Sequence, residues 1–310
     1  MLAAGGTGGH LFPAFALAEE LTRRGIAVDL MTDHRGDRYG TGFPARTIYP
    51  VPSATLSGRS PIAMLATGST LVRGILVARR VLADVAPAAV VGFGGYPSFP
   101  PLIAARMRAI PTVLHEQNAV LGRANRLLAK VAGTIATSFE TTRFLEGAAA
   151  AKARLTGNPV RQIVIDQAAR SYDPSAATAA FRMVVFGGSQ GARYFSDVMP
   201  PALAHLPPDL KSRVQLVQQC RDEDMARVEV AYANSGIAAT LAPFFKDLPE
   251  RLAGAHLVIG RAGASSVAEF GVLGRPSILV PLPHALDNDQ LQKLLASPNQ
   301  GRRGVSSRKP

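Results

Sequence analysis

Short apolar runs alternate with longer amphipathic stretches along most of this chain. In the first half, the apolar runs predict strands at residues 2–4, 26–32, 88–92, 111–114 and 134–137. Between them, the stretches at 13–24 and 61–85 have the length and the apolar spacing of helices. Strands joined by helices in this way are typical of a parallel sheet with crossover connections, so the pattern indicates an α/β fold.

The same pattern restarts in the second half of the chain. Apolar runs predict strands at residues 183–186, 214–218, 240–242, 257–259 and 277–280. The turn tripeptide Gly157-Asn158-Pro159 separates the two halves, and each half opens with a strand, a glycine loop and a helix. We therefore predict two Rossmann-like domains, 1–156 and 157–292, that face each other across a cleft. A polar, basic tail follows at 293–310.

The composition and net charge of the chain indicate which kinds of molecule it could bind. The net charge of +12 suits anionic partners such as nucleotide phosphates, a lipid pyrophosphate or an acidic membrane face. Nucleic acid is disfavoured because aromatics are only 6% of the chain, Trp is absent and no nucleic-acid-binding motif is evident. The start of the chain does not resemble a signal peptide, and no apolar run reaches the ~18–20 residues of a membrane span. Together with the single Cys220, these features predict a cytosolic protein.

The glycine loop at residues 5–10 is the sharpest local motif. Glycines let the backbone approach a ligand closely, and the helix that follows offers free N–H groups to a phosphate. A tight turn without a ligand is the alternative, as is a dinucleotide site with Asp33 as its ribose acid. His10, directly behind the loop, could take a proton from a sugar hydroxyl, or could merely hydrogen-bond near the helix start.

Two further strand-to-helix junctions lie in the second half. The loop at residues 187–191 contains Ser189 and suits a diphosphate in the same way. At residues 260–269, Glu269 could hold ribose hydroxyls, but Ser266 and Glu269 also have the spacing of a capping box.

Polar side chains at residues 115–118 follow a predicted strand and are expected to point towards the cleft. Since no second cluster of metal ligands is evident, we interpret them as hydrogen-bonding groups for a sugar rather than as a metal site. The helix at 61–85 carries Arg73, Arg79 and Arg80, so it could lie on an anionic membrane face or pack in the core.

Six segments, taken in order, closely resemble the MurG family of glycosyltransferases: residues 5–10, 115–118, 157–161, 187–193, 261–269 and 283–290. The resemblance implies the glycosyltransferase-B architecture and a place on the cytoplasmic face of the plasma membrane as a peripheral protein. It implies inverting transfer of N-acetylglucosamine from UDP-N-acetylglucosamine to the C4 hydroxyl of the lipid-linked muramyl-pentapeptide of peptidoglycan synthesis. The donor is a substrate, and no metal or other cofactor is implied.

The resemblance also implies roles for individual residues. Thr7, Gly8 and Gly9 would hold the lipid pyrophosphate, His10 would be the base, and Asn118 would lie between the substrates. The donor would be held by a second set, in which Arg161 and Ser189 meet the diphosphate and sugar, Phe245 lies at the uracil, Glu269 holds ribose and Gln290 binds the sugar. The nucleotide itself would be wrapped by Gly263, Ala264, Ser265, Ser266, Val267 and Ala268.

The chain departs from the family at its ends. The first strand is short, and the family continues past residue 292 with further strand–helix units where this chain carries the basic tail. The resemblance therefore implies an incomplete second domain, from truncation or a shifted reading frame. Besides an active transferase, this leaves open a chain that binds nucleotide or lipid without turnover. A UDP-sugar epimerase of the same architecture is another alternative, and a dehydrogenase is a more distant one.

Overall fold

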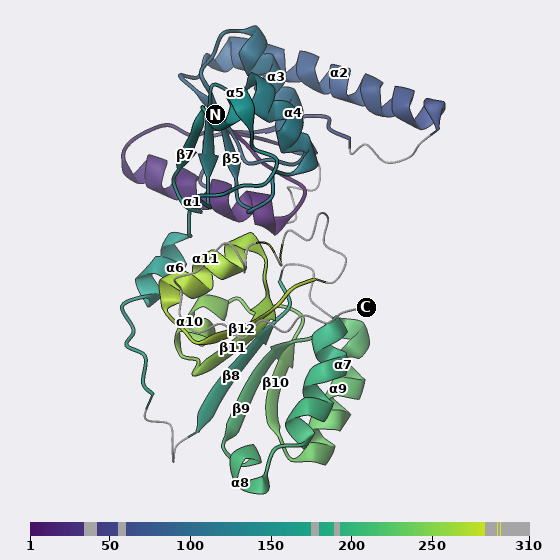
Figure 1. Ribbon diagram of the computed structural model, residues 1–310, viewed down its shortest axis with the longest axis vertical. Coiled ribbons are helices and arrows are strands. Elements are labelled where there is room, and N and C mark those ends of the chain that lie inside the picture. Colours follow the sequence, from purple (N-terminus) through teal and green to yellow (C-terminus); the bar gives the residue numbers. More distant parts are fainter. Residues whose placement is uncertain are drawn as a thin grey trace. The chain divides into compact units, whose positions relative to one another are not determined.

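The computed structural model describes residues 1–33, 42–54, 60–174, 180–188, 193–282, 290 and 292. The chain forms two compact units, Met1–Arg161 and Gln162–Pro310 (Figure 1). The sequence placed the seam before Gly157, a few residues earlier. Gly157 belongs to the first unit because its N–H donates to the Thr137 carbonyl and its own carbonyl accepts from the His115 ring. The predicted tail at 293–310 lies outside the described residues.

The first unit is built on a seven-stranded, all-parallel sheet. Its strands are β1 (Leu2–Ala3), β2 (Leu30–Thr32), β3 (Ile48–Pro50), β4 (Val90–Gly92), β5 (Thr112–Glu116), β6 (Thr134–Thr137) and β7 (Ala153–Leu155). They lie in the order β3-β2-β1-β4-β5-β6-β7. Because the order reverses between β1 and β4, the loops after these two strands flank the crevice in which such sheets bind ligands.

Helices cover both faces of this sheet. They are α1 (Gly8–Arg23), α2 (Pro61–Val85), the 3₁₀ turn η2 (Tyr96–Ser98), α3 (Phe99–Met107), α4 (Arg123–Val131) and α5 (Gly147–Ala150). Successive residues of a strand point to opposite faces. Leu30 accordingly packs with Leu11 of α1, whereas its neighbour Met31 packs with Leu82 of α2.

The second unit repeats the plan with five parallel strands in the order β10-β9-β8-β11-β12. The strands are β8 (Phe181–Phe186), β9 (Val214–Gln219), β10 (Ala238–Ala242), β11 (Leu257–Arg261) and β12 (Ser277–Val280). The helices are α6 (Gln162–Gln167), α7 (Arg193–Ala204), α8 (Pro208–Lys211), α9 (Asp222–Ser235), α10 (Leu248–Ala253) and α11 (Ala264–Leu273). Here the order reverses between β8 and β11, so the loops after those strands flank the second crevice.

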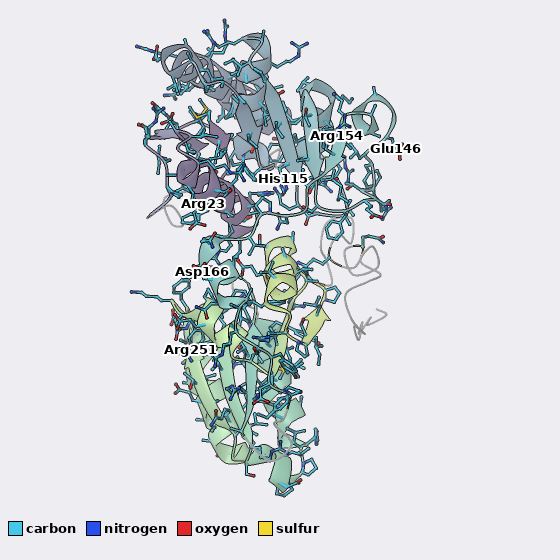
Figure 2. The ribbon with its side chains drawn as sticks, turned by 90° about the vertical axis from the view of Figure 1, so that its left-hand side faces the viewer. Arg23, His115, Glu146, Arg154, Asp166 and Arg251 are labelled. Atoms are coloured by element: carbon cyan, nitrogen blue, oxygen red, sulfur yellow. The ribbon has the colours of Figure 1, made fainter. Side chains whose placement is uncertain are left out.

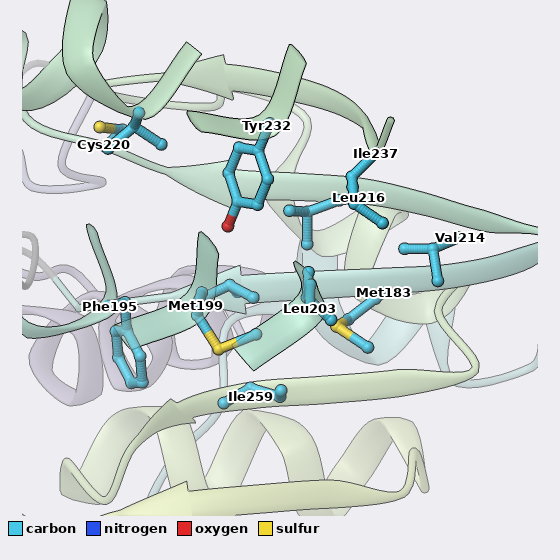
Figure 3. Close-up of a cluster of buried hydrophobic side chains, with 12 residues drawn as sticks. Met183, Phe195, Met199, Leu203, Val214, Leu216, Cys220, Tyr232, Ile237 and Ile259 are labelled. Carbon is cyan, nitrogen blue, oxygen red and sulfur yellow. The ribbon is translucent and has the colours of Figure 1, made fainter. Parts of the chain in front are cut away.

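One face of the second sheet carries the core of that unit. Met183 of β8 and Leu216 of β9 pack there against Phe195 of α7 and Tyr232 of α9 (Figure 3). The two parallel α/β domains predicted from the apolar pattern are confirmed. Each contains its own hydrophobic core and its own topological switch point.

In the first unit, α2 closely approaches the loop after β3, and this contact can be tested by mutation. A Cβ added at Gly74 would lie 2.1 Å from the Pro52 carbonyl oxygen, whereas one added at Gly68 of the same helix meets no atom within 4 Å. We expect Gly74→Ala to lower the free energy of unfolding by about 1–3 kcal/mol through overpacking. Gly68→Ala should raise it by up to about 1 kcal/mol through helix propensity. Urea unfolding of both variants checks this, and equal effects would contradict the described contact.

Candidate functional site

The loop after β1 is held in place by a buried carboxylate. Gly6 has a φ of +82°, which favours glycine, and its N–H donates to Asp33 Oδ1 at 3.3 Å. A Cβ added at Gly5 would lie only 2.8 Å from the same oxygen. Asp33 is buried at the end of β2 and fixes the path of the glycine loop. Asp33 therefore has a structural role in the loop, which accounts for this residue without the ribose-binding role of a dinucleotide site.

The loop leads directly into α1, which begins at Gly8 rather than near residue 13 as the sequence predicted. Thr7 is the N-cap residue, with extended backbone and no capping hydrogen bond from its side chain. The first amides of a helix have no intrahelical acceptor, so the Gly8 and Gly9 N–H groups are available to a ligand. With the positive end of the helix dipole, this helix start has the features that suit a phosphate.

His10 lies in the first turn of α1 and has a defined tautomer. Its Nδ1 is 2.8 Å from the carbonyl oxygen of Phe93, just after β4. Because a carbonyl can only accept, Nδ1 carries the proton and Nε2 keeps a lone pair when the ring is neutral. Gly95, with a φ of +69°, lies against the ring, and a Cβ there would be 3.3 Å from Nε2. The switch point of the first unit thus holds an imidazole that can accept a proton.

A chain of buried hydrogen bonds connects this histidine with β5. Gln117 Nε2 donates to the Phe93 carbonyl at 2.9 Å and lies 3.0 Å from Nδ1 of His115. The other ring nitrogen of His115 donates to the Gly157 carbonyl at 3.0 Å. His115 lies inside the first unit (Figure 2). His115 and Gln117 are therefore engaged within the fold, whereas the sequence predicted that they would bind a sugar.

Glu116 organises the turn that follows β5. It is 1% exposed, and Oε1 accepts from the backbone and side-chain N–H groups of Asn118 at 2.9 and 3.0 Å. Oε2 accepts from the Gly122 backbone at 2.9 Å and from Asn125 Nδ2 at 2.8 Å. Of the predicted polar cluster, Asn118 alone is only half-buried, and the carboxylate of Glu116 sets its orientation.

Burial of His115 makes stability depend on pH. Burial, and less strongly the nearby His10, lowers the pKa of His115, although its bond to Gly157 acts in the opposite direction. Below pH ~6.5 the unfolded chain protonates this ring more readily than the folded one. Stability is thus complete above the unfolded pKa and is lost as the pH falls through the folded pKa.

We expect His115→Gln to flatten the decline of the unfolding free energy between pH ~7 and ~5, measured by urea unfolding at each pH. Part of the decline should remain, because burial lowers the pKa of His256 in the second unit as well. His205→Gln, a change on the exposed end of α7, is the matched control. An unchanged profile in His115→Gln would contradict the neutral state of that ring.

In the second unit, the glycine loop after β8 is tied to the loop after β10. Gly188 has a φ of +90°, and the Gly187 N–H donates to Gln219 Oε1 at 3.2 Å. Gln219 Nε2 donates in turn to the Pro243 carbonyl at 3.1 Å. The sequence analysis missed Gln219, although a polar residue at the carboxyl end of β9 is the available signal. Ser189 lies outside the described residues.

The junction between β11 and α11 differs from the capping box considered for it. The N-cap residue is Gly263 and the helix begins at Ala264, so Ser266 is already inside the first turn and cannot be the cap. The capping-box interpretation is therefore wrong. Glu269 is buried on α11, and the Ser265 hydroxyl is buried without a partner in the described structure. Polar groups placed in this way beside a switch point suit a ligand.

Arg261, the last residue of β11, is a buried cation of the same region. Its guanidinium lies 4.7 Å from the ring centroid of Tyr194, and Nη1 donates to the Pro281 carbonyl at 3.0 Å. Burial lowers the pKa of this group. The Arg261 side chain was not among the residues predicted from the sequence. A guanidinium held by an aromatic ring and a carbonyl supplies positive charge next to the start of α11.

The remaining predicted residues lie on several elements. The Arg161 guanidinium is 4.4 Å from the ring centroid of Phe12 of α1, within the first unit. Phe245 follows β10, with the Arg251 guanidinium 4.8 Å from its ring centroid. Gln290 Oε1 accepts from the Leu282 backbone at 2.8 Å. Val267 and Ala268 belong to α11, where Val267 is buried and its N–H donates to the Gly263 carbonyl.

In each unit, some of the predicted residues lie at the switch point of that unit's sheet. The first unit brings together the start of α1, His10 and the turn containing Asn118, at the carboxyl ends of β1, β4 and β5. The second brings together the loops after β8 and β11. Within the described ranges, no group of three or more His, Cys, Asp or Glu side chains is placed to hold a metal ion.

Both units match known protein families. Residues 1–137 match the glycosyltransferase family 28 N-terminal domain, and residues 182–301 match the C-terminal domain of that family. A protein of Methylobacterium sp. (strain 4-46) is 55% identical over 94% of this chain and 78% of its own length. One of Rhodopseudomonas palustris is 54% identical over 94% of this chain and 79% of its own length. Both are named UDP-N-acetylglucosamine–N-acetylmuramyl-(pentapeptide) pyrophosphoryl-undecaprenol N-acetylglucosamine transferase.

Solved structures agree with this relationship. The crystal structure of Acinetobacter baumannii MurG is 26% identical and matches 99% of this chain and 83% of its own, with a TM-score of 0.74. UDP-GlcNAc 2-epimerase from Neisseria meningitidis matches 96% of this chain and 90% of its own with a TM-score of 0.61 at 13% identity, which indicates a shared fold alone.

Proposed function

The chain belongs to glycosyltransferase family 28, in its MurG branch, and on this premise we propose that it transfers N-acetylglucosamine from UDP-N-acetylglucosamine to lipid-linked N-acetylmuramyl-pentapeptide. The observation that carries the proposal is the identity of 55%, over 94% of the chain, to a transferase with that name. The relatives extend beyond this chain, which spans 78% of the length of that protein.

The first unit is assigned to the acceptor. The pyrophosphate of the lipid would bind the amides of Gly8 and Gly9 and the hydroxyl of Thr7 at the start of α1. His10 Nε2 would take the proton from the C4 hydroxyl of the muramyl sugar as its oxygen attacks the anomeric carbon. Attack from the face opposite UDP inverts the configuration there. Asn118, oriented by Glu116, would hydrogen-bond a sugar next to the reacting atoms.

The second unit is assigned to the donor. The segment from Gly263 to Ala268 would wrap the nucleotide, Glu269 would hold the ribose, and Phe245 would lie at the uracil. Arg161, Ser189 and Gln290 would contact the sugar and diphosphate. Helix starts and guanidinium groups offset the charge that grows on UDP as it leaves, and the proposal needs no additional cofactor.

We further propose that α2 docks on the anionic cytoplasmic face of the plasma membrane. One side of α2 is in the core, where Ala78 and Leu82 are fully buried. The other side exposes Leu65, Val72 and Leu76, with Leu65 77% exposed, beside Arg73, Arg79 and Arg80. An apolar surface flanked by arginines favours an anionic bilayer. No helix in the described part of the chain is long and apolar enough to span a bilayer.

The test is release of UDP from UDP-N-acetylglucosamine, with and without a short-chain analogue of the lipid-linked muramyl-peptide. Release that requires the acceptor supports the proposed transfer. Release without the acceptor would indicate an epimerase instead. Binding of UDP-N-acetylglucosamine without release, by a folded sample, would indicate a chain that binds its donor but does not turn it over.

The role of Glu269 can be isolated with a donor that lacks the ribose 2′-hydroxyl. Truncating a partner of a sugar hydroxyl removes discrimination for that hydroxyl. The unaltered protein should therefore have a higher kcat/KM for the natural donor than for the 2′-deoxy donor. Glu269→Ala should reduce the ratio of these two kcat/KM values by about tenfold or more. Glu250→Ala, an exposed change on α10, is the control. Equal discrimination in Glu269→Ala would remove the ribose assignment.

A further inference from the structure

Gln117 is a buried polar side chain to which the proposed mechanism gives no role. It is 1% exposed and lies between the rings of His10 and His115, because its amide nitrogen approaches both the Phe93 carbonyl and His115 Nδ1. A carbonyl cannot donate, so the amide nitrogen and not the oxygen must face Phe93. This assigns the orientation of the side chain.

The two backbone carbonyls fix every proton in this chain of hydrogen bonds. At one end, the Gly157 carbonyl requires a proton on His115 Nε2, which leaves His115 Nδ1 as an acceptor for Gln117. At the other end, the Phe93 carbonyl accepts from both Gln117 Nε2 and His10 Nδ1. A carbonyl oxygen has two lone pairs, so both bonds can form together.

The oxygen of the Gln117 amide is left without a partner. It is buried, and the described structure offers it no donor. An orphaned buried acceptor costs about 1–3 kcal/mol, which a purely structural residue at this position would be expected to avoid. The hydrogen bonds from the Gln117 amide nitrogen to the Phe93 carbonyl and to His115 therefore set the orientation of the amide. In this orientation the amide oxygen has no donor.

We propose that Gln117 is a positioning residue that anchors the Phe93 carbonyl and thereby keeps His10 in the Nδ1–H tautomer, with the Nε2 lone pair available to the acceptor hydroxyl. This inference rests on the proposed function, in which His10 is the base. Gln117 touches neither substrate in this scheme. Its influence passes through one carbonyl oxygen to the ring of His10.

The test compares the unaltered chain with Gln117→Met, which keeps the length of the side chain but cannot donate. Nitrogen-15 NMR of selectively labelled histidines, with the His10 signals assigned from His10→Asn, reports the tautomer without any substrate. We expect the Nδ1–H form in the unaltered chain and a mixture of tautomers in Gln117→Met. In steady-state transfer, we expect kcat to fall by about 10- to 100-fold while the KM for UDP-N-acetylglucosamine stays the same.

Gln117→Leu is the second variant if Gln117→Met does not fold, because its apolar side chain also offers no donor to Phe93. Gln215→Met, an exposed change on β9, should leave tautomer and kcat unaltered. An unchanged His10 tautomer in a folded Gln117 variant, or an unchanged kcat, would overturn the inference. If the unaltered chain transfers no sugar, the proposed function fails, and the NMR comparison still decides whether Gln117 sets the tautomer.

Discussion

His10→Ala is expected to lower kcat for sugar transfer by about 100- to 10,000-fold, the usual contribution of a positioned general base. The change removes the Nε2 lone pair but leaves the amides of Gly8 and Gly9 free to hold the acceptor pyrophosphate. The proposed function assigns the donor mainly to the second unit, so the KM for UDP-N-acetylglucosamine should change little. Acceptor-dependent UDP release at varied donor concentrations, under saturating acceptor, measures both parameters.

His205→Ala is the matched control, since His205 is an exposed histidine at the end of α7. It should retain full activity. The His10 variant should also keep the unfolding free energy nearly intact, because the ring contributes one hydrogen bond from a half-buried position. A folded His10→Ala chain with normal kcat would show that another group, or water, takes the proton.

The apolar pattern predicts the central strands of both sheets, but it misses the two edge strands of the first sheet. β3 (Ile48–Pro50) is half exposed and contains a proline, and β7 (Ala153–Leu155) carries Arg154. Neither has the continuous apolar run of a strand that is buried on both faces. The central strands have that run, and they carry the residues of the site.

The sequence predicts which polar residues cluster at the switch points, but not what each one contacts. His115, Glu116 and Gln117 follow an apolar run, and β5 extends through the first two of them. The partners of His115 and Gln117 are backbone carbonyls of Gly157 and Phe93, 42 and 24 residues away in the chain. Every residue has such a carbonyl, so no side-chain pattern can reveal these partners before the strands are assembled.

At the helix starts, too, the sequence indicates the kind of element but not its contacts or its first residue. The Ser266–Glu269 spacing matched a capping box, yet the turn after β11 places the N-cap at Gly263. Tertiary packing of β11 and α11 therefore decides where the helix begins, and local spacing does not. The loop at 5–10 was likewise expected to precede a helix that starts near residue 13, yet α1 begins at Gly8. Its glycines do reflect a steric demand, because a Cβ at Gly5 would lie 2.8 Å from Asp33.

Glu116→Ala is expected to have the largest effect on stability, lowering the free energy of unfolding by about 3–5 kcal/mol. Its carboxylate accepts four hydrogen bonds, two from Asn118, one from Gly122 and one from Asn125. Alanine would leave all four donors without this acceptor, and the cost is greatest for the buried Asn125 amide. Urea unfolding monitored by circular dichroism measures the loss.

Glu116→Gln separates the shape of this side chain from its acceptor capacity. The amide has the same size but turns one oxygen into a donor, which would face either the two N–H groups of Asn118 or those of Gly122 and Asn125. We expect Glu116→Gln to lie between the unaltered chain and Glu116→Ala, while Glu146→Ala, on the surface at the start of α5, stays within about 0.5 kcal/mol of the unaltered chain. A loss below about 1 kcal/mol in Glu116→Ala would mean that the turn carrying Asn118 does not depend on the carboxylate. The orientation of Asn118 towards the acceptor would then need another cause.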